Sequence, residues 1–139
     1  YPDKVAIHLS FDPILPRMIY GGTDAVLVPS RYEPCGLTQM EAMRYGAVPI
    51  VRKTGGLADS VEDFDMIKGT GNGFVFESYD KYALFGTMIR AMEVHKHREL
   101  WLKIQQEAMR ADFSWENSAG EYAKIFLRAI EFHSKRLNQ

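Results

Sequence analysis

The sequence AVLVPSRYEPCGLTQMEAMRYG, residues 25–46, contains a short apolar run, a polar loop and a helical segment in succession. Residues 25–28 are continuously apolar and end at Pro29, which is typical of a strand buried in a parallel sheet. Residues 38–45 are predicted to form a helix that ends at Gly46, because glycine readily takes the left-handed conformation that terminates a helix. A strand, a loop and a helix in this order form the repeating unit of α/β proteins.

The same alternation extends to both sides of this stretch. Further strands are predicted at 5–9, 48–51 and 74–76, with a helix at 16–20, and the pattern is helical throughout after Glu77. We therefore predict an α/β fold with a Rossmann-like parallel sheet and flanking helices. Apolar stripes mark the later helices: Tyr82, Phe85, Met88, Ile89 and Met92; then Leu100, Trp101, Ile104 and Ala108; then Trp115, Ala119, Tyr122, Phe126 and Ile130, with Ser114 as a cap.

Composition narrows the class of protein. The 139 residues are 46% apolar and 25% charged, which indicates a soluble globular domain and excludes a disordered chain. The net charge of -1 provides no general attraction to nucleic acid or to an anionic membrane, and no charge-free run approaches the ~20 residues of a membrane span. The single cysteine, Cys35, excludes an internal disulfide and a cysteine-rich zinc site.

The loop that follows residues 25–28 has the features of an anion site. Gly36 allows a ligand to approach the backbone, and the N–H groups of residues 37–39 would point at a phosphate at the start of a helix. A phosphate would repel the carboxylate of Glu33, so Glu33 is better suited to sugar hydroxyls or to a developing positive charge. The alternative is that Glu33 only caps the loop or pairs with Arg31.

A second loop, RKTGGL at 52–57, places Gly55 and Gly56 at the start of another short helix. One such pair is often only a tight turn, but two glycine loops on consecutive units predict that two helix N-termini converge. The loop is not a P-loop, because Lys53 and Thr54 precede the glycines.

Residues 30–39, SRYEPCGLTQ, resemble the starch and glycogen synthases of glycosyltransferase family 5. The similarity continues through 42–46, 48–57, 73–77 and 112–115. The resemblance implies two Rossmann-like domains facing across a cleft, ADP-glucose as donor, and retaining transfer of glucose to the non-reducing end of an α-1,4-glucan. It implies no metal and no other cofactor.

The resemblance also implies roles for individual residues. Glu33 matches the glutamate that holds the transferred glucose and supports its oxocarbenium-like transition state, and Cys35 matches the active-site cysteine of the family. Residues 53–57 also resemble a lysine motif that the family carries near the start of its first domain. Because these residues follow Glu33, they match the loop of the second domain instead, and Lys53 is not expected to bind nucleotide. The donor-binding matches are Phe11 over adenine, Gly36, Leu37 and Thr38 at the diphosphate, Thr54, Gly55 and Gly56 beside it, and Glu41 at the ribose.

The resemblance covers only the end of such an enzyme. We therefore expect residues 1–139 to be the second, C-terminal domain, incomplete at its N-terminal side, with residues 115–139 as a helix that packs toward the absent first domain. The expected partners are ADP-glucose, the glucan and that first domain, in the bacterial cytoplasm or the plastid stroma. The resemblance implies that the Arg and Lys which neutralise the diphosphate lie in the part of the second domain that it does not cover. This chain alone is therefore expected to be inactive.

Doubly wound domains usually order their strands 3-2-1-4-5-6. The resemblance implies that residues 5–9 are the third strand and that the strand beginning at Ala25 is the fourth, with the first two strands in the segment that the resemblance does not cover. We therefore predict that the strands beginning at Ala25, Val48 and Phe74 pair with one another, while residues 5–9 lack neighbours and an apolar strand edge stays open. Two alternatives to the synthase remain: a non-catalytic accessory that binds nucleotide or glucan, and a related retaining transferase that uses UDP-glucose.

Overall fold

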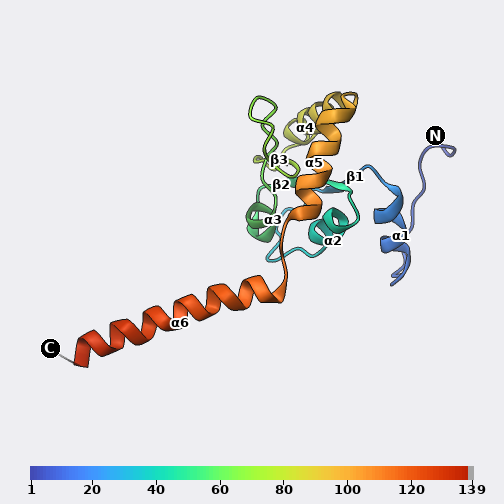
Figure 1. The fold of residues 1–139 in the computed structure, drawn as a ribbon. Helices are drawn as coiled ribbons and strands as arrows, with labels where there is room; N and C mark the ends of the chain where they lie inside the picture. Colours follow the sequence, from blue (N-terminus) through green and yellow to red (C-terminus); the bar gives the residue numbers. More distant parts are fainter. Residues whose placement is uncertain (138–139) are drawn as a thin grey trace.

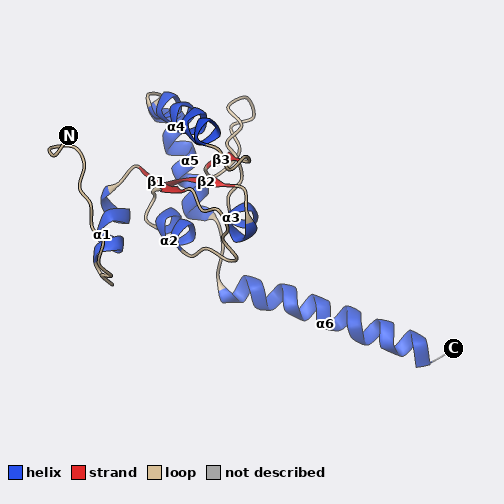
Figure 2. Cartoon of the chain, turned by 180° about the vertical axis from the view of Figure 1, so that it is seen from behind, coloured by secondary structure: helices blue, strands red, loops and turns tan. Residues whose placement is uncertain are grey.

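The computed structural model describes residues 1–137 and contains one sheet with helices on both sides (Figures 1 and 2). The elements, in chain order, are α1 (Leu15–Gly22), β1 (Ala25–Val28), α2 (Thr38–Arg44), β2 (Val48–Arg52), α3 (Gly55–Ser60), β3 (Phe74–Phe76), α4 (Lys81–His95), α5 (Arg98–Arg110) and α6 (Trp115–Leu137).

The sheet has three parallel strands in the order β1-β2-β3. Ala25 pairs with Val48 and Ile50 pairs with Phe74, so the predicted pairing of these strands is confirmed. The central strand β2 is buried from Val48 to Val51. This parallel order places the loops that follow β1 and β2 at the same edge of the sheet.

The two faces of the sheet bury separate cores. On one face, Phe74 stacks on Trp101 with ring centroids 6.2 Å apart, among residues of α4 and α5. On the other face, Val51 packs with Met43 of α2 and Leu57 of α3. Figure 2 shows α4 on one side of the strands and α2 and α3 on the other. Helices therefore cover both faces of the sheet, and the two glycine loops lie at its carboxyl edge.

The predicted strand at residues 5–9 is wrong. Val5, Ile7 and Leu9 are 61%, 80% and 93% exposed and form no strand. A strand is stabilised by hydrogen bonds to a neighbour, and within residues 1–137 no segment pairs with this one. The other part of the prediction is confirmed: residues 5–9 do not pair with β1, whose outer edge is unpaired in the described part of the chain.

Helix α4 forms as predicted, but its predicted core stripe does not pack. Tyr82, Phe85, Ile89 and Met92 are exposed, whereas the buried positions are Thr87, Ala91 and Val94. The small residues let the helix approach β2 and β3 closely, and the larger apolar side chains then face outward. In α5 the predicted stripe is confirmed, because Trp101, Ile104 and Ala108 are buried.

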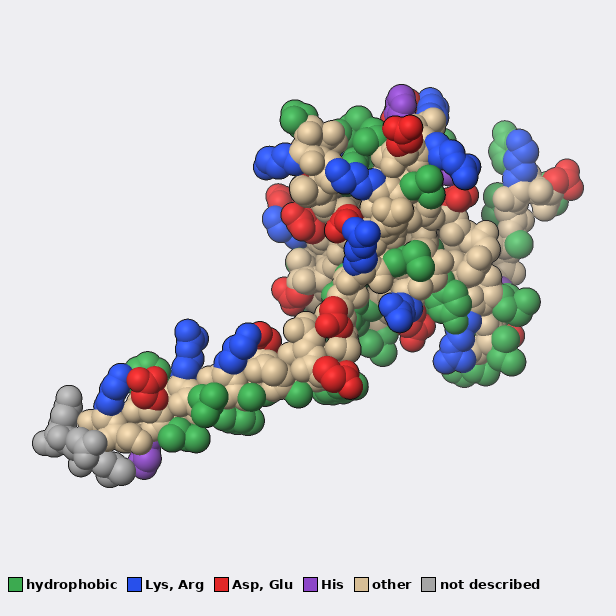
Figure 3. Space-filling view, in the orientation of Figure 1, with side chains coloured by type: hydrophobic (Ala, Val, Ile, Leu, Met, Phe, Trp, Pro, Cys, Tyr) green, Lys and Arg blue, Asp and Glu red, His purple; other side chains and the backbone are tan. Residues whose placement is uncertain are grey.

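Helix α6 extends away from the rest of the molecule (Figure 1). The predicted cap is confirmed, because the Asn117 N–H donates to the Ser114 hydroxyl at 3.3 Å. No residue from 115 to 136 is buried. Figure 3 shows hydrophobic side chains along one side of this helix and charged side chains on the other. None of the helices in residues 1–137 combines the length and the apolar character that crossing a membrane requires.

Candidate active site

The loops after β1 and β2 meet at the carboxyl edge of the sheet. The Gly56 N–H donates to the Glu33 carbonyl oxygen at 3.1 Å. A Cβ at Gly55 would overlap that same oxygen, and a Cβ at Gly56 would overlap the carbonyl oxygen of Cys35. Only glycine fits at these two positions. The predicted convergence of the two glycine loops is confirmed, and it depends on direct contact between their backbones.

The first loop enters α2 through a left-handed residue. Gly36 has φ +72°, and a Cβ there would lie 2.6 Å from the side-chain oxygen of Gln39. Within residues 1–137, the N–H groups of Leu37 and Thr38 donate no hydrogen bond, and both residues are exposed. These groups lie at the positive end of the α2 dipole and can be reached by an anion.

The expectation that the Gln39 N–H also faces a ligand is wrong, because Gln39 is fully buried. In the second loop, Thr54 is half-buried and Gly55 is exposed, and over the described part of the chain neither N–H donates a hydrogen bond. The N–H groups accessible at the two converging loops are therefore those of Leu37, Thr38, Thr54 and Gly55.

Glu33 belongs to the first loop, next to its contact with Gly56 of the second loop, and is half-buried. Its carboxylate accepts one hydrogen bond, from the Ser30 hydroxyl at 3.3 Å. Among residues 1–137 it forms no ion pair, so the alternative of a pair with Arg31 is wrong; the Arg31 guanidinium instead lies 5.9 Å from the ring of Tyr79. A carboxylate held this lightly retains most of its capacity to accept hydrogen bonds.

Cys35 and Phe11, two further predicted site residues, are both exposed. Cys35 is exposed and its thiol is free. Phe11 is 94% exposed in the irregular segment before α1, and its role over adenine stays a prediction.

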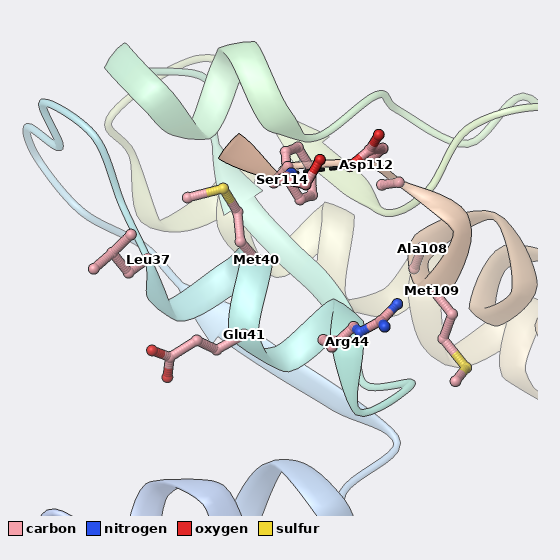
Figure 4. Close-up of a pocket in the computed structure, with 10 residues that line it drawn as sticks. Leu37, Met40, Glu41, Arg44, Ala108, Met109, Asp112 and Ser114 are labelled. Carbon is pink, nitrogen blue, oxygen red and sulfur yellow. Dashed lines mark hydrogen bonds between the residues drawn. The ribbon is translucent and has the colours of Figure 1, made fainter. Parts of the chain in front are cut away.

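Glu41 lies on the exposed face of α2 beside a cavity of about 450 Å³ between α2, α5 and residues 111–114. In Figure 4 its carboxylate points away from Asp112 and Ser114, while Arg44 points toward Met109. The cavity and the converging loops share Leu37, but Glu33 and Gly56 do not line the cavity.

Arg52 and Lys53, two cations near the loops, are held by hydrogen bonds and an ion pair within the protein. Arg52, at the end of β2, donates to the carbonyl oxygens of Ser30, Arg31 and Glu77 at 3.0, 2.6 and 3.2 Å. Lys53 pairs with the Glu77 carboxylate at 2.8 Å. The hydrogen bond and charge of each partner raise the pKa of Lys53 and lower the pKa of Glu77.

Sequence reasoning missed two structural residues of the site. Arg52 joins the ends of all three strands, and Gln39 joins the two glycine loops through its side-chain amide. The signal for Gln39 was its place on the inner face of a helix, beside Ala42 and Met43, where a polar side chain must find buried partners. Nothing in the sequence indicated the three carbonyl partners of Arg52.

Comparisons with known proteins identify a family of glycosyltransferases. The model of the family described as glycosyl transferases group 1 matches residues 2–108. A glycogen synthase from Moorella thermoacetica is 49% identical over 132 residues, covering 94% of this chain and 27% of that protein. Glycogen synthase 1 of a Synechocystis strain is 49% identical over 126 residues, covering 91% and 26%. The chain thus spans about a quarter of the length of these relatives.

Two solved structures match as well. The catalytic domain of starch synthase IV from Arabidopsis thaliana, bound to ADP and acarbose, superposes with a TM-score of 0.77 at 42% identity, over 88% of this chain and 26% of that one. Sucrose-phosphate synthase from Thermosynechococcus elongatus superposes with a TM-score of 0.64 at 25% identity, over 93% and 31%. The predicted α/β glycosyltransferase fold is confirmed, as is the resemblance to starch and glycogen synthases. The chain belongs to the glycosyl transferases group 1 family.

Proposed function

We propose that this chain is the donor-binding part of a retaining glucosyltransferase that uses ADP-glucose to extend an α-1,4-glucan at its non-reducing end. The observation that carries the proposal is the contact of the two glycine loops around Glu33, with accessible N–H groups on both loops. The similarity to glycogen synthases and to a starch synthase solved with ADP supports the choice of substrates.

We propose that two kinds of contact hold the donor. The diphosphate is assigned to the N–H groups of Leu37 and Thr38 at the start of α2 and to those of Thr54 and Gly55 on the second loop. The transferred glucose is assigned to Glu33, whose carboxylate can accept hydrogen bonds from sugar hydroxyls. Glu41 is assigned to the ribose, Phe11 to the adenine, and Cys35 and Gly56 border the sugar.

The proposed transfer of glucose forms no covalent bond between the sugar and the enzyme. The bond from the glucose C1 to the diphosphate oxygen breaks, and a bond from C1 to the acceptor hydroxyl oxygen forms on the same face. The acceptor proton passes to the departing phosphate. As positive charge develops at C1, its attraction to the Glu33 carboxylate strengthens, so the carboxylate stabilises the transition state more than the ground state. We propose that no metal or other cofactor takes part.

Arg52 and Lys53 cannot neutralise the diphosphate without leaving their hydrogen-bond and ion-pair partners. Each missing charge-assisted hydrogen bond costs about 1.5–3 kcal/mol. We therefore propose that the other cationic contacts come from elsewhere in the complete enzyme, and that residues 1–139 alone bind the donor weakly and do not turn over. The proposal places the enzyme in the bacterial cytoplasm or the plastid stroma.

Helix α6 is assigned to contact with the other domain of the enzyme. Its apolar side chains Trp115, Tyr122, Phe126 and Ile130 are 60–84% exposed on a helix that leaves the packed unit. Such an apolar stripe on a long helix favours docking to a second surface.

The proposal is tested by glucose transfer from ADP-glucose and UDP-glucose by the complete enzyme that contains this chain. Replacing Glu33 by Ala is expected to lower kcat by about 10²-fold or more with little change in donor KM, because the charge it stabilises appears only in the transition state. Arg31→Ala, which removes the neighbouring cation stacked on Tyr79, is the control and is expected to keep most of the turnover. An unchanged kcat with a raised KM in Glu33→Ala would make Glu33 a ground-state binding residue, and a wild-type enzyme that transfers no glucose would refute the proposed activity.

A further inference from the structure

The side chain of Gln39 connects the two loops of the site from inside the protein. Its amide nitrogen donates to the Gly36 carbonyl oxygen at 2.8 Å and to the Ser60 hydroxyl at 2.9 Å. The Ser60 hydroxyl donates in turn to the Gly56 carbonyl oxygen at 2.6 Å. Because the Gly56 N–H donates to the Glu33 carbonyl oxygen, the hydrogen bonds run from Gly36 through Gln39, Ser60 and Gly56 to Glu33.

The donors and acceptors of this network require an amide at position 39. The Ser60 hydroxyl has one proton, which it gives to Gly56, so it can only accept from Gln39. The Gly36 carbonyl also accepts. One NH₂ group therefore donates to two acceptors, and this fixes the orientation of the amide. A carboxylate or a thioether has no N–H and cannot replace it.

The amide oxygen of Gln39 has the opposite character. It is buried, and within residues 1–137 it has no hydrogen-bond partner. A buried acceptor without a partner in the protein does not add to the stability of the folded state. A methionine of similar length would fill the same space without an unpaired oxygen.

We propose that Gln39 is a positioning residue that sets the relative placement of the two glycine loops, and through them of the Leu37 and Thr38 N–H groups and of Glu33. The inference rests on the proposed function, because its consequence is a loss of donor alignment. Gln39 is fully buried, so we place it out of reach of the substrate, where it acts through Gly36 and Ser60.

Gln105 provides a matched control. It is also a helical glutamine, and its amide nitrogen donates at 2.7 Å to the carbonyl oxygen of Gly46, which like Gly36 is left-handed, with φ +84°. Gly46, however, follows the C-terminal end of α2, whereas Gly36 precedes its N-terminal end. Both substitutions by Met remove a hydrogen bond from a glutamine to a glycine carbonyl, but Gln39→Met removes it at the site and also removes the bond to the Ser60 hydroxyl.

The experiment compares Gln39→Met and Gln105→Met in the complete enzyme by thermal unfolding and by steady-state kinetics with ADP-glucose. The expected result is a kcat at least about tenfold lower for Gln39→Met, since misplacement of substrate contacts by about an ångström has effects of this size or larger. Gln105→Met is expected to keep the wild-type kcat. Equal kcat and donor KM for the two variants would overturn the proposal.

Ser60 tests the same network if Gln39→Met does not fold. Ser60→Ala removes the hydroxyl that links Gln39 to Gly56, whereas Ser60→Thr keeps it. The proposal expects a reduced kcat for Ser60→Ala and recovery in Ser60→Thr; a wild-type kcat in Ser60→Ala would overturn it. A wild-type enzyme without transfer activity would refute the proposed function itself, whereas normal wild-type activity with an unaffected Ser60→Ala would refute only the role of Gln39.

Discussion

Helices α5 and α6 carry similar amphipathic patterns but meet different surroundings. Helix α5 buries Trp101, Ile104 and Ala108 beside β2 and α4. Helix α6 repeats large apolar residues at the same spacing, yet none of its residues from 115 to 136 is buried. The pattern therefore indicates that a helix has a face suited to packing, whereas the presence of a partner surface depends on the rest of the fold.

The contrast is strongest at the two tryptophans. Trp101 is 6% exposed and Trp115 is 84% exposed. Trp101 stacks on Phe74 at 6.2 Å and meets the edge of His95 at 4.8 Å. We expect Trp101→Ala to lower the free energy of unfolding by about 3–5 kcal/mol, because it leaves a cavity in the core. Trp115→Ala is expected to change it by less than about 0.5 kcal/mol in this chain.

Urea unfolding of the two variants, followed by the fluorescence of the remaining tryptophan and by circular dichroism, measures this difference. A loss of stability in Trp115→Ala as large as that in Trp101→Ala would show that α6 folds back on the packed unit, and would remove the contrast between the two helices.

The same change, from glycine to alanine, can be made at the two loops and in α6. A Cβ at Gly56 would overlap the backbone of Cys35, whereas nothing lies within 4 Å of a Cβ at Gly120 in α6. Gly56→Ala is expected to destabilise the chain by about 2–3 kcal/mol, because backbone atoms must move apart. Gly120→Ala is expected to increase the helix content of α6, since alanine favours a helix interior by about 1 kcal/mol over glycine.

Thermal unfolding and far-ultraviolet circular dichroism record both effects. Gly86→Ala, in the middle of α4 and likewise without a neighbour within 4 Å, is the control for a helical glycine inside the packed unit. A Gly56→Ala variant as stable as Gly86→Ala would contradict the close contact of the two loops.

The smallest expected effect is at the junction between α5 and α6. The hydroxyl and the N–H of Ser114 lower the pKa of Asp112, and that N–H donates to the Asp112 carboxylate at 2.9 Å. Because the folded-state pKa is lower than in the unfolded chain, the stabilisation is complete above the unfolded value and is lost as the pH falls through the folded one. We expect the start of α6 to loosen on acidification, with little change in the sheet.

Amide chemical shifts and exchange of residues 112–118 between pH 6 and pH 3, with Asp112→Asn as the control, check this prediction. Asp112→Asn is expected to remove the pH dependence at Ser114. An unchanged dependence in that variant would assign the effect to another group.

Local residue chemistry predicted the part of the site that is made of backbone. The run from Ala25 to Val28, the helix that ends before Gly46 and the glycine pair at 55–56 are recognisable because strand burial, helix termination and close backbone approach each restrict the residue types allowed. Their alternation predicted parallel strands, whose carboxyl ends lie at one edge, so the meeting of the two loops could also be predicted.

What the tertiary structure decided is which surfaces and side chains find partners. Residues 5–9 alternate as a strand does but have no neighbour within residues 1–137, and α4 turns its small residues rather than its large apolar ones to the sheet. Arg52 and Gln39 look like ordinary polar residues in the sequence. In the fold, Arg52 donates to carbonyl oxygens of segments that lie far apart in the chain, and Gln39 donates to the Gly36 carbonyl oxygen and to the distant Ser60 hydroxyl. A sequence pattern records the conformation that each residue favours locally, whereas packing partners and buried hydrogen bonds depend on which distant segments the fold brings together.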